Sequence, residues 1–227
     1  MKKIIIYSTY DKIISLNLVN EIISNNFFKN YKIDILLTKP SIIRKIKILL
    51  VIIFFGSLKD FIKYFNQKKS IKEILLKNKN CSLIEKIKND YEFGLSVYCS
   101  SKIEIQKYKI YNFHLGSLYN QRGSFIFFYK FIKNWDKISL TFHEISDRFD
   151  VGKIINEREI LLGKNSFASD IFYLYLNNLD FLMESIKKIN TAEKKEYKQF
   201  EKLNVVPSFY RLAKEIALFY LKKNKVD

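Results

Sequence analysis

The N-terminal stretch KIIIYSTYDKIISLNLVNEIISNNFFKNYKIDILLT, residues 3–38, contains the first indication of the architecture. Its two ends, residues 3–7 and 31–38, are almost continuously apolar and rich in β-branched residues, as buried strands of a parallel sheet are. Between them, residues 11–27 repeat apolar side chains at intervals of three and four, which predicts a helix. A strand, a helix and a strand in this order form a right-handed crossover, so we expect an α/β fold.

The rest of the chain continues this alternation and adds an antiparallel pair. Residues 137–145 and 152–160 alternate apolar and polar side chains, which is typical of a β-hairpin. The other predicted strands are 91–99 and 107–114, and the other predicted helices are 70–78, 82–90 with a Ser82–Glu85 capping box, 124–135, 166–189 and 208–223. These elements predict a Rossmann-like, mostly parallel twisted sheet flanked by helices, with a β-hairpin and a short helical C-terminal tail.

The composition narrows the functional classes without selecting a partner. The 227 residues include 40 Lys and Arg against 23 Asp and Glu, a formal net charge of +17. Such a charge suits a nucleic acid or an anionic membrane, but the lysines are scattered along the chain, as in proteins of AT-rich genomes. Only two cysteines, Cys81 and Cys99, are present, and the first apolar run ends at Ser8, too early for a signal peptide. We therefore expect a cytoplasmic protein.

The segment 41–66 is the most apolar part of the chain and has three interpretations. Residues 48–55 form an uninterrupted apolar run, but a membrane-spanning helix needs about 20 such residues and this run stops at Gly56. The segment is predicted to be a helix that covers the sheet, one that lies in a membrane interface with its lysines at the head groups, or one that forms a dimer contact. The sequence leaves all three open, so membrane association of the protein stays open as well.

An amide and an imidazole stand together near the end of one predicted strand. Side chains alternate between the two faces of a strand, so Asn112 and His114 share one face. The aromatic residues Tyr111 and Phe113 share the other. The strand ends just before Gly116, and open α/β sheets bind ligands beyond the carboxyl ends of their strands. The pair is therefore a candidate for a site at this edge, although a solvated strand end would have the same pattern.

Four linked motifs resemble the folate-dependent formyltransferase family. They are Asn-x-His, present as NFH at 112–114, Arg-Gly at 122–123, Thr-x-His, present as TFH at 141–143, and Asp-x-Gly, present as DVG at 150–152. All four occur in the family's order and at its spacings, and residues 93–103 look like the family's preceding strand and loop. The resemblance implies a formyltransferase domain over residues 1–190, followed by a helical appendage over 191–227.

The resemblance implies a catalytic triplet of Asn112, His114 and Asp150. Formyl transfer needs a neutral amine, and the ordinary pKa of histidine lies near neutrality, so His114 is expected to take the proton of the amine. The Asn112 amide would donate to the oxyanion, which can contribute about 3 kcal/mol, and Asp150 would orient the imidazole. No metal is required. A metal site of His114, His143 and Asp150 is a weaker alternative, because no short-spaced pair of ligands anchors it.

The same resemblance implies N10-formyltetrahydrofolate as the formyl donor. The expected folate-binding residues are Ser96, Tyr98, Arg122, Gly123, His143, Ser146 and Asp147. His143 shares a strand face with Thr141 and is expected to support the site rather than to act as the base. The family's loop before the catalytic aspartate usually carries an Asp and a Gly, where this chain has Ser146 and Arg148.

The sugar N-formyltransferases fit the sequence best among the members of this family. The segment YSTYDKIIS, residues 7–15, lacks the glycines that cradle a ribonucleotide phosphate in the purine-pathway enzymes. The methionyl-tRNA enzymes add a β-rich second domain, whereas a helical tail is predicted here. The expected partner is a nucleotide-linked amino sugar for surface polysaccharide biosynthesis, with Tyr7 or Tyr10 exposed to the nucleotide, and no nucleic acid is expected to bind.

Several alternatives remain open from the sequence. The chain could resemble the methionyl-tRNA or glycinamide ribonucleotide enzymes in activity as well as in fold. It could instead be a basic nucleic-acid-binding protein, although no basic stripe with spaced aromatic residues is recognisable. It could also be a homologue that keeps the fold without catalysing a reaction. A homodimer is compatible with each of these.

Overall fold

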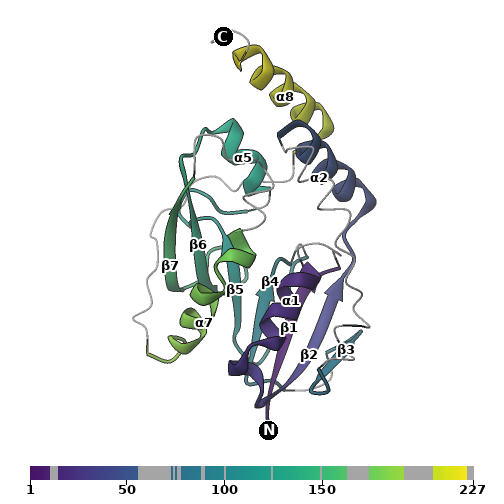
Figure 1. The fold of residues 1–227 in the computed structure, drawn as a ribbon, viewed down its shortest axis with the longest axis vertical. Coiled ribbons are helices and arrows are strands. Elements are labelled where there is room, and N and C mark those ends of the chain that lie inside the picture. Colours follow the sequence, from purple (N-terminus) through teal and green to yellow (C-terminus); the bar gives the residue numbers. More distant parts are fainter. Residues whose placement is uncertain are drawn as a thin grey trace.

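A computed structural model of the protein contains one seven-stranded sheet (Figure 1). Its strand order is β3-β2-β1-β4-β5-β6-β7. The first five strands in this order run parallel to one another, whereas β6 runs antiparallel to both of its neighbours, β5 and β7. The predicted α/β class and the mostly parallel sheet are confirmed. The residues that the structure describes are 1–10, 15–55, 73, 75, 78–87, 90–99, 101–123, 125–148, 150–162, 174–191 and 207–223.

The described elements follow the predicted order closely. The strands are β1 Lys2–Thr9, β2 Tyr31–Thr38, β3 Cys81–Ile84, β4 Phe93–Val97, β5 Ile110–Leu115, β6 Lys137–Glu144 and β7 Ile154–Leu161. The helices are α1 Ser15–Ser24, the short 3-10 helix η1 Asn26–Phe28, α2 Ile42–Phe55, α5 Ile126–Ile132, α7 Leu179–Lys187 and α8 Phe209–Lys223. The antiparallel pairing of β6 with β7 confirms the predicted hairpin.

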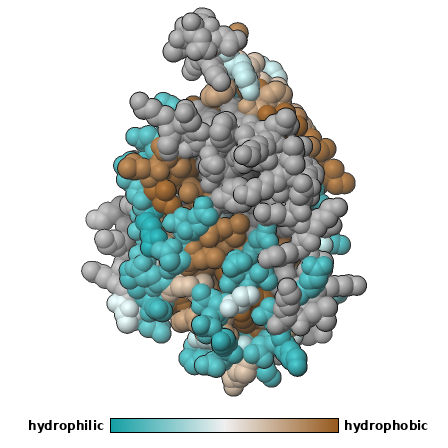
Figure 2. All heavy atoms as spheres, viewed as in Figure 1, coloured by the Kyte–Doolittle hydropathy of each residue, from teal (hydrophilic) through white to brown (hydrophobic). Residues whose placement is uncertain are grey.

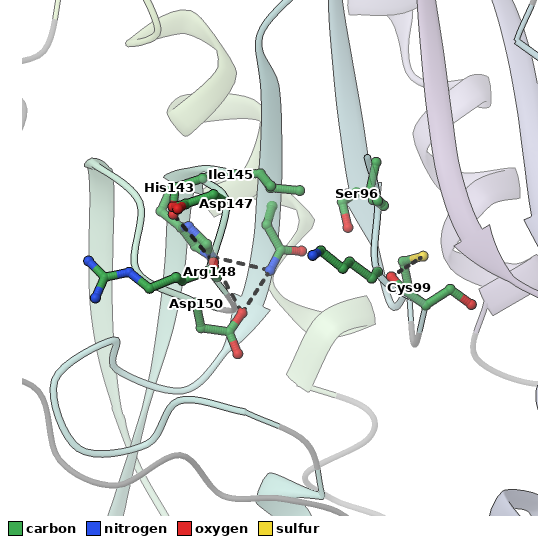
Figure 3. A pocket seen from close by; sticks show the side chains of 12 residues that line it. Ser96, Cys99, His143, Ile145, Asp147, Arg148 and Asp150 are labelled. Carbon is green, nitrogen blue, oxygen red and sulfur yellow. Dashed lines mark hydrogen bonds and ion pairs between the residues drawn. The ribbon is translucent and has the colours of Figure 1, made fainter. Parts of the chain in front are cut away.

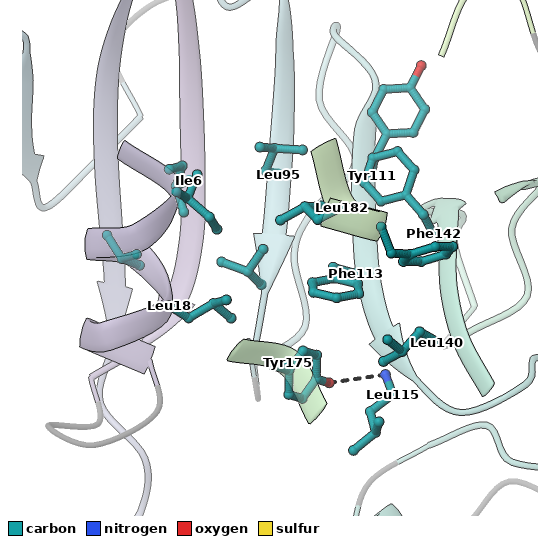
Figure 4. Packing of buried hydrophobic residues seen from close by; sticks show 14 of the residues in the cluster. Ile6, Leu18, Leu95, Tyr111, Phe113, Leu115, Leu140, Phe142, Tyr175 and Leu182 are labelled. Atoms are coloured by element: carbon teal, nitrogen blue, oxygen red, sulfur yellow. Dashed lines mark hydrogen bonds between the residues drawn. The ribbon is translucent and has the colours of Figure 1, made fainter. Parts of the chain in front are cut away.

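The larger hydrophobic core lies on one face of the sheet, against α1 and α7 (Figure 4). Leu95 of β4 and Phe113 of β5 point to this face, where Leu18 of α1 and Leu182 of α7 pack against the sheet. Each strand contributes every second residue to this face because side chains alternate along a strand. The helix predicted from the spacing of apolar residues at the N-terminus is thus confirmed from Ser15 onward, and its buried stripe faces the sheet.

The opposite face of the sheet carries a smaller hydrophobic cluster. Ile5, Tyr7, Tyr91 and Ile110 are its buried members. Tyr7 is 2 % exposed, and its hydroxyl group lies 2.5 Å from that of Tyr108. The expectation that Tyr7 is exposed to a nucleotide is therefore wrong, because the alternation of β1 places it under this second cluster rather than at the surface.

The helix predicted at 82–90 is also wrong, since its first residues belong to strand β3. Cys81 pairs with Ile33 and Ile84 with Leu36, so β3 extends the sheet beyond β2. A helix of nine residues is marginal by itself, and the open edge of β2 offers backbone hydrogen bonds that a local capping box cannot match. Tertiary pairing therefore overrides the local signal here.

The helices α2 and α8 lie together at one end of the molecule (Figure 1). Leu50 of α2 packs against the larger core, as do Leu212 and Ile216 of α8, which are spaced by one helical turn. In Figure 1, α2 lies beyond the carboxyl end of β2 rather than along a face of the sheet. The helix predicted at 208–223 is confirmed. Among the described helices, none combines the length and the apolar character that crossing a membrane requires.

Some predicted elements fall outside the described residues. They include the part of the predicted helix 41–66 that follows Phe55, most of 70–78, the start of the helix at 166–173, and residues 192–206. The division of the chain between residues 190 and 191 stays a prediction.

Candidate active site

A row of polar side chains crosses the sheet near the carboxyl ends of β4 and β5. Ser96 of β4 pairs in register with Asn112 of β5, and Asn112 pairs with His143 of β6. Residues paired in this way point to the same side of a sheet, here the side opposite the larger core. They line a pocket that is open to solvent (Figure 3). The lining residues are Ser96, Cys99, Ser101, Lys102, Ile103, Asn112, His143, Ile145, Ser146, Asp147, Arg148 and Asp150.

The side-chain amide of Asn112 is oriented by two neighbours. Its Nδ2 donates to Nε2 of His143 at 3.2 Å and reaches Oδ1 of Asp150 at 3.5 Å (Figure 3). Both contacts use the NH2 group, which is a donor only, so they define which end of the amide faces Asp150. The contact to Asp150 is at the upper limit for a hydrogen bond, so this hydrogen can turn to a closer acceptor.

His143 is a neutral ring in one tautomer. It is 1 % exposed, and burial lowers its pKa to about 4, although the charge of Asp150 opposes this shift. Its Nδ1 lies 3.0 Å from the carbonyl oxygen of Glu144, which can only accept, so Nδ1 carries the proton. Nε2 therefore accepts from Asn112, and its 3.9 Å approach to Asp150 Oδ1 is not an ion pair.

His114 presents one free nitrogen to the same carboxylate. Its Nε2 lies 3.3 Å from the carbonyl oxygen of Gln121, so this nitrogen carries a proton and donates it. Its Nδ1 lies 3.7 Å from Oδ1 of Asp150. His114 thus has one nitrogen whose proton is held by the backbone and one nitrogen that faces a carboxylate.

The carboxylate of Asp150 is held from its other side by the turn that precedes α5. Oδ2 accepts the backbone N–H of Gly123 at 2.7 Å. Asp150 has a positive φ of 50°, and Gly123 has one of 104°. A proton acceptor and an amide donor therefore each lie within 4 Å of the same carboxylate oxygen, Oδ1 of Asp150. Such a set can move a proton and stabilise an oxyanion during acyl transfer.

The architecture of this chain is similar to that of several solved structures. WlaRD, a sugar 3N-formyl transferase crystallised in the presence of dTDP and 5-N-formyl-THF, superimposes with a TM-score of 0.62 at 19 % identity, over 90 % of this chain and 70 % of WlaRD. The N-formyltransferase from Helicobacter canadensis, in complex with folinic acid and dTDP-3-aminofucose, has a TM-score of 0.62 at 17 % identity, over 99 % of this chain and 82 % of its own. The chain has the formyltransferase fold.

A third solved structure agrees with these two. The 4-N formyltransferase from Francisella tularensis has the formyltransferase fold with a TM-score of 0.56 at 17 % identity, over 97 % of this chain and 86 % of that one. No protein-family model matches the sequence, and no curated protein matches it. The likeness is thus one of fold, and the neighbours in this fold are sugar N-formyltransferases and related formyltransferases.

Within the formyltransferase fold, the predicted site residues divide into two groups. Those that line the pocket are Ser96, Asn112, His143, Ser146, Asp147 and Asp150. Those outside the lining are Tyr98, His114, Arg122 and Gly123. Of these, His114 is buried beside Asp150, Gly123 binds Asp150 through its backbone, and the ring of Tyr98 lies 5.9 Å from that of Tyr175. Binding of folate by the expected set stays a prediction.

Six lining residues on two loops were not predicted as site residues: Cys99, Ser101, Lys102, Ile103, Ile145 and Arg148. The likeness of residues 93–103 to the strand and loop of the formyltransferase fold was the signal that could have found most of them. Burial raises the pKa of the Cys99 thiol, so this cysteine is protonated at neutral pH and is not a nucleophile candidate. Lys102 is exposed and adds a positive charge to the pocket rim.

Gln121 is a supporting residue that the sequence motifs did not single out. Its side chain is buried, its Oε1 accepts the backbone N–H groups of Ser117 and Ser139, and its Nε2 donates to the carbonyl of Lys137 at 2.8 Å. Its own carbonyl accepts from Nε2 of His114. One residue therefore ties the turn after β5 to β6 and sets the tautomer of the candidate base.

Replacing Gln121 by Leu is expected to lower the free energy of unfolding by about 3 kcal/mol, because three backbone groups, one in a buried and two in part-buried hydrogen bonds, lose their partner. A buried backbone group costs about 1–3 kcal/mol when it is left unsatisfied. For a chain of this size, the melting temperature should fall by about 10 °C in differential scanning fluorimetry. The matched control is Gln106→Leu, which removes one exposed hydrogen bond to the carbonyl of Glu104. Equal stability of the two variants would contradict this role of Gln121.

Two glycines lie against the two carbonyl groups that orient the histidines. A Cβ atom added at Gly116, which has a φ of +135°, would lie 2.1 Å from the carbonyl oxygen of Gln121. A Cβ atom added at Gly152 would lie 1.4 Å from the carbonyl oxygen of Glu144. These are the carbonyl groups that accept from His114 and His143. The absence of a side chain at both glycines is therefore a condition for the geometry of the site.

The buried neutral state of His143 predicts a specific dependence of stability on pH. The pKa of His143 is about 4 in the folded protein, against 6.5 for an ordinary histidine, so between these values only the unfolded chain takes up the proton. The free energy of unfolding should therefore fall as the pH drops from 6.5 to 4, by about 3 kcal/mol from this group. Urea unfolding of the native protein and of His143→Gln at several pH values measures the difference. Identical pH slopes in the two proteins would refute the neutral buried state.

Proposed function

We propose that this protein is an N-formyltransferase that moves a formyl group from N10-formyltetrahydrofolate to the amine of a nucleotide-linked amino sugar. The observation that carries the proposal is the convergence of Asn112 and His114 on Asp150, whose Oδ1 lies 3.7 Å from His114 Nδ1 and 3.5 Å from Asn112 Nδ2. Asn112 and Asp150 line the pocket, and His114 is buried beside Asp150. The three residues come from a strand and a loop that are 36 residues or more apart in sequence, so their meeting is a property of the fold and not of a local motif.

The candidate base is the Nδ1 atom of His114. When a neutral amine forms a bond to the formyl carbon and the bond from that carbon to N10 breaks, the amine must lose one proton and N10 must gain one. Nδ1 of His114 can carry this proton, because the other nitrogen is already committed to the carbonyl of Gln121. The carboxylate of Asp150 then faces the protonated nitrogen and compensates its positive charge.

The candidate oxyanion donor is the NH2 group of Asn112. Addition to the formyl group places a negative charge on its oxygen, and a donor oriented before the reaction stabilises that charge. His143 holds one hydrogen of this group, whereas the second makes only the 3.5 Å contact with Asp150. The second hydrogen is therefore the one that would turn to the oxyanion.

The pocket is lined by both apolar and polar groups, as sites for small molecules usually are. Ile103 and Ile145 offer apolar surface for a ring, and Ser96 and Ser146 offer hydroxyl groups. The folate tail and a sugar nucleotide are both anionic, which suits the positive charge of Lys102 at the rim.

The structural neighbours support the substrate class. WlaRD was crystallised with dTDP, and the enzyme from Helicobacter canadensis with dTDP-3-aminofucose. By analogy of fold, we propose a dTDP- or UDP-linked amino sugar as the acceptor here, in the synthesis of a surface polysaccharide such as lipopolysaccharide O-antigen.

Mass spectrometry of acceptor panels tests this proposal. The purified protein is incubated with N10-formyltetrahydrofolate and with dTDP- or UDP-linked 3-amino and 4-amino deoxyhexoses, and in parallel with glycinamide ribonucleotide and with methionyl-tRNA. We expect one amino-sugar nucleotide to gain the mass of one formyl group and the other two substrates to stay unchanged. Formylation of methionyl-tRNA or glycinamide ribonucleotide instead would reassign the substrate. Formylation of none would favour a fold without this activity.

A further inference from the structure

The largest exposed apolar side chains are concentrated on two helices that have no part in the candidate site. Among the described residues, fifteen large hydrophobic side chains are exposed, and ten of them belong to α2 or α8. Ile42 of α2 is 75 % exposed and Tyr210 of α8 is 79 % exposed. Two helices with 29 residues thus hold two thirds of these side chains, whereas isolated exposed apolar residues are normal elsewhere on a protein.

The two helices form one surface because they contact each other. The hydroxyl group of Tyr220 donates to the carbonyl of Phe54 at 2.7 Å, and the rings of these residues are 6.3 Å apart. At the other end of the contact, Nζ of Lys47 lies 5.0 Å from the ring of Phe209. We call the exposed side of α2 (Ile42–Phe55) and α8 (Phe209–Lys223) the α2–α8 surface. Figure 2 shows hydrophobic atoms along the upper right edge of the molecule, over α2.

The α2–α8 surface also carries positive charge. The sequences of the two helices contain seven basic residues, of which Lys47 is buried, and one acidic residue, Glu215. Lys45, Arg211 and Lys214 are exposed among the apolar side chains. The surface is therefore apolar and positively charged at the same time, so a fitting partner must offer both apolar contact and negative charge.

We propose that the α2–α8 surface binds peripherally to an anionic membrane. The acyl region of a bilayer accepts exposed side chains such as Ile42 and Tyr210, while the acidic head groups that border it accept lysine and arginine. A nucleic acid would match the charge but leave the apolar side chains in water. A second copy of the chain would match the apolar side chains but place like charges opposite each other. Of these three partners, only an anionic lipid surface satisfies both properties.

This proposal does not depend on formyl transfer, and its test does not use activity. The native protein is sedimented with vesicles of phosphatidylglycerol and phosphatidylcholine, and with vesicles of phosphatidylcholine alone. We expect binding to the anionic vesicles, weaker binding as salt is raised, and little binding to the neutral vesicles. The variant Ile42→Asp with Tyr210→Asp should lower the partition coefficient on anionic vesicles by about tenfold or more, because it replaces two apolar contacts by negative charges.

The matched control is Ile105→Asp with Leu161→Asp, at two residues that are 65 % and 78 % exposed but lie outside α2 and α8. It makes the same change in charge and should bind anionic vesicles at least tenfold more tightly than the test variant. All changed residues are exposed, so melting temperatures should agree within a few degrees. Absence of vesicle binding by the native protein, or equal losses in both variants, would overturn the proposal. A native dimer that only the test variant converts to a monomer would overturn it too, since the surface would then join two copies.

Discussion

Replacing His114 by Asn is expected to abolish measurable formyl transfer while the protein stays folded. Removal of a general base usually costs about 10²- to 10⁴-fold in rate, and His114 Nδ1 is the candidate base because its partner nitrogen is already bound to the carbonyl of Gln121. The loss of that single hydrogen bond should cost only about 1 kcal/mol of stability. The rate is measured with the amino-sugar nucleotide that the acceptor panel identifies, and the fold is checked by circular dichroism.

Two companion variants separate a chemical role of His114 from a structural one. In His114→Gln, the longer amide can still donate to the carbonyl of Gln121, yet it has no titratable nitrogen beside Asp150, so it should be as inactive as the Asn variant. In His143→Gln, the other histidine is removed, and the expected loss is about tenfold, because one hydrogen bond that orients Asn112 is weakened. Substantial activity in either His114 variant would refute the assignment of the base.

Replacing Gly152 by Ala, which adds one methyl group, is expected to destabilise the protein strongly. The added Cβ would lie 1.4 Å from the carbonyl oxygen and 2.5 Å from the carbonyl carbon of Glu144, so the backbone itself must move. That carbonyl accepts from His143 Nδ1, and the N–H of Glu144 donates to Lys153 at 2.8 Å, so the shift disturbs the hairpin and the site together. We expect a loss of about 3 kcal/mol or more in urea unfolding.

Gly94→Ala provides the matched control, because Gly94 also lies in the sheet, near Ser96. The Cβ added there would come 3.1 to 3.3 Å from side-chain atoms of Tyr7 and Ile110, which can shift by a few tenths of an ångström. Its cost should therefore be small, about 1 kcal/mol. If both glycine variants were equally stable, the close approach of Gly152 to Glu144 would not be a structural requirement.

Residues of two of the sequence motifs contact one another around Asp150. In the DVG motif, Asp150 faces His114, and Gly152 leaves room for the carbonyl that sets the tautomer of His143. In the Arg-Gly motif, the backbone of Gly123 holds the carboxylate of Asp150. The spacing of these motifs along the chain is thus a consequence of one hydrogen-bonded arrangement around Asp150.

Periodicity in the sequence was sufficient for most of the fold. A strand that is covered on both faces has a continuous apolar sequence, as β1 does. A helix with one buried face repeats apolar residues every three or four positions, as α1 does. The alternation along β5 also placed Asn112 and His114 on one face, as the structure has them. The four motifs predict a site at Asn112, His114 and Asp150, and the structure brings the first two residues against the carboxylate of the third.

Only the tertiary structure could decide what depends on contacts between distant segments. The pairing of Cys81–Ile84 with β2 made a strand of a predicted helix, since hydrogen bonds to an open sheet edge outweigh the weak preference of nine residues. The burial of Tyr7, the network of Gln121 and the tautomers of both histidines arise from partners that are far away in sequence or across strands. The sequence pattern of an element predicts which of its faces is buried. Which other element it packs or pairs with depends on the free energy of the whole assembled sheet.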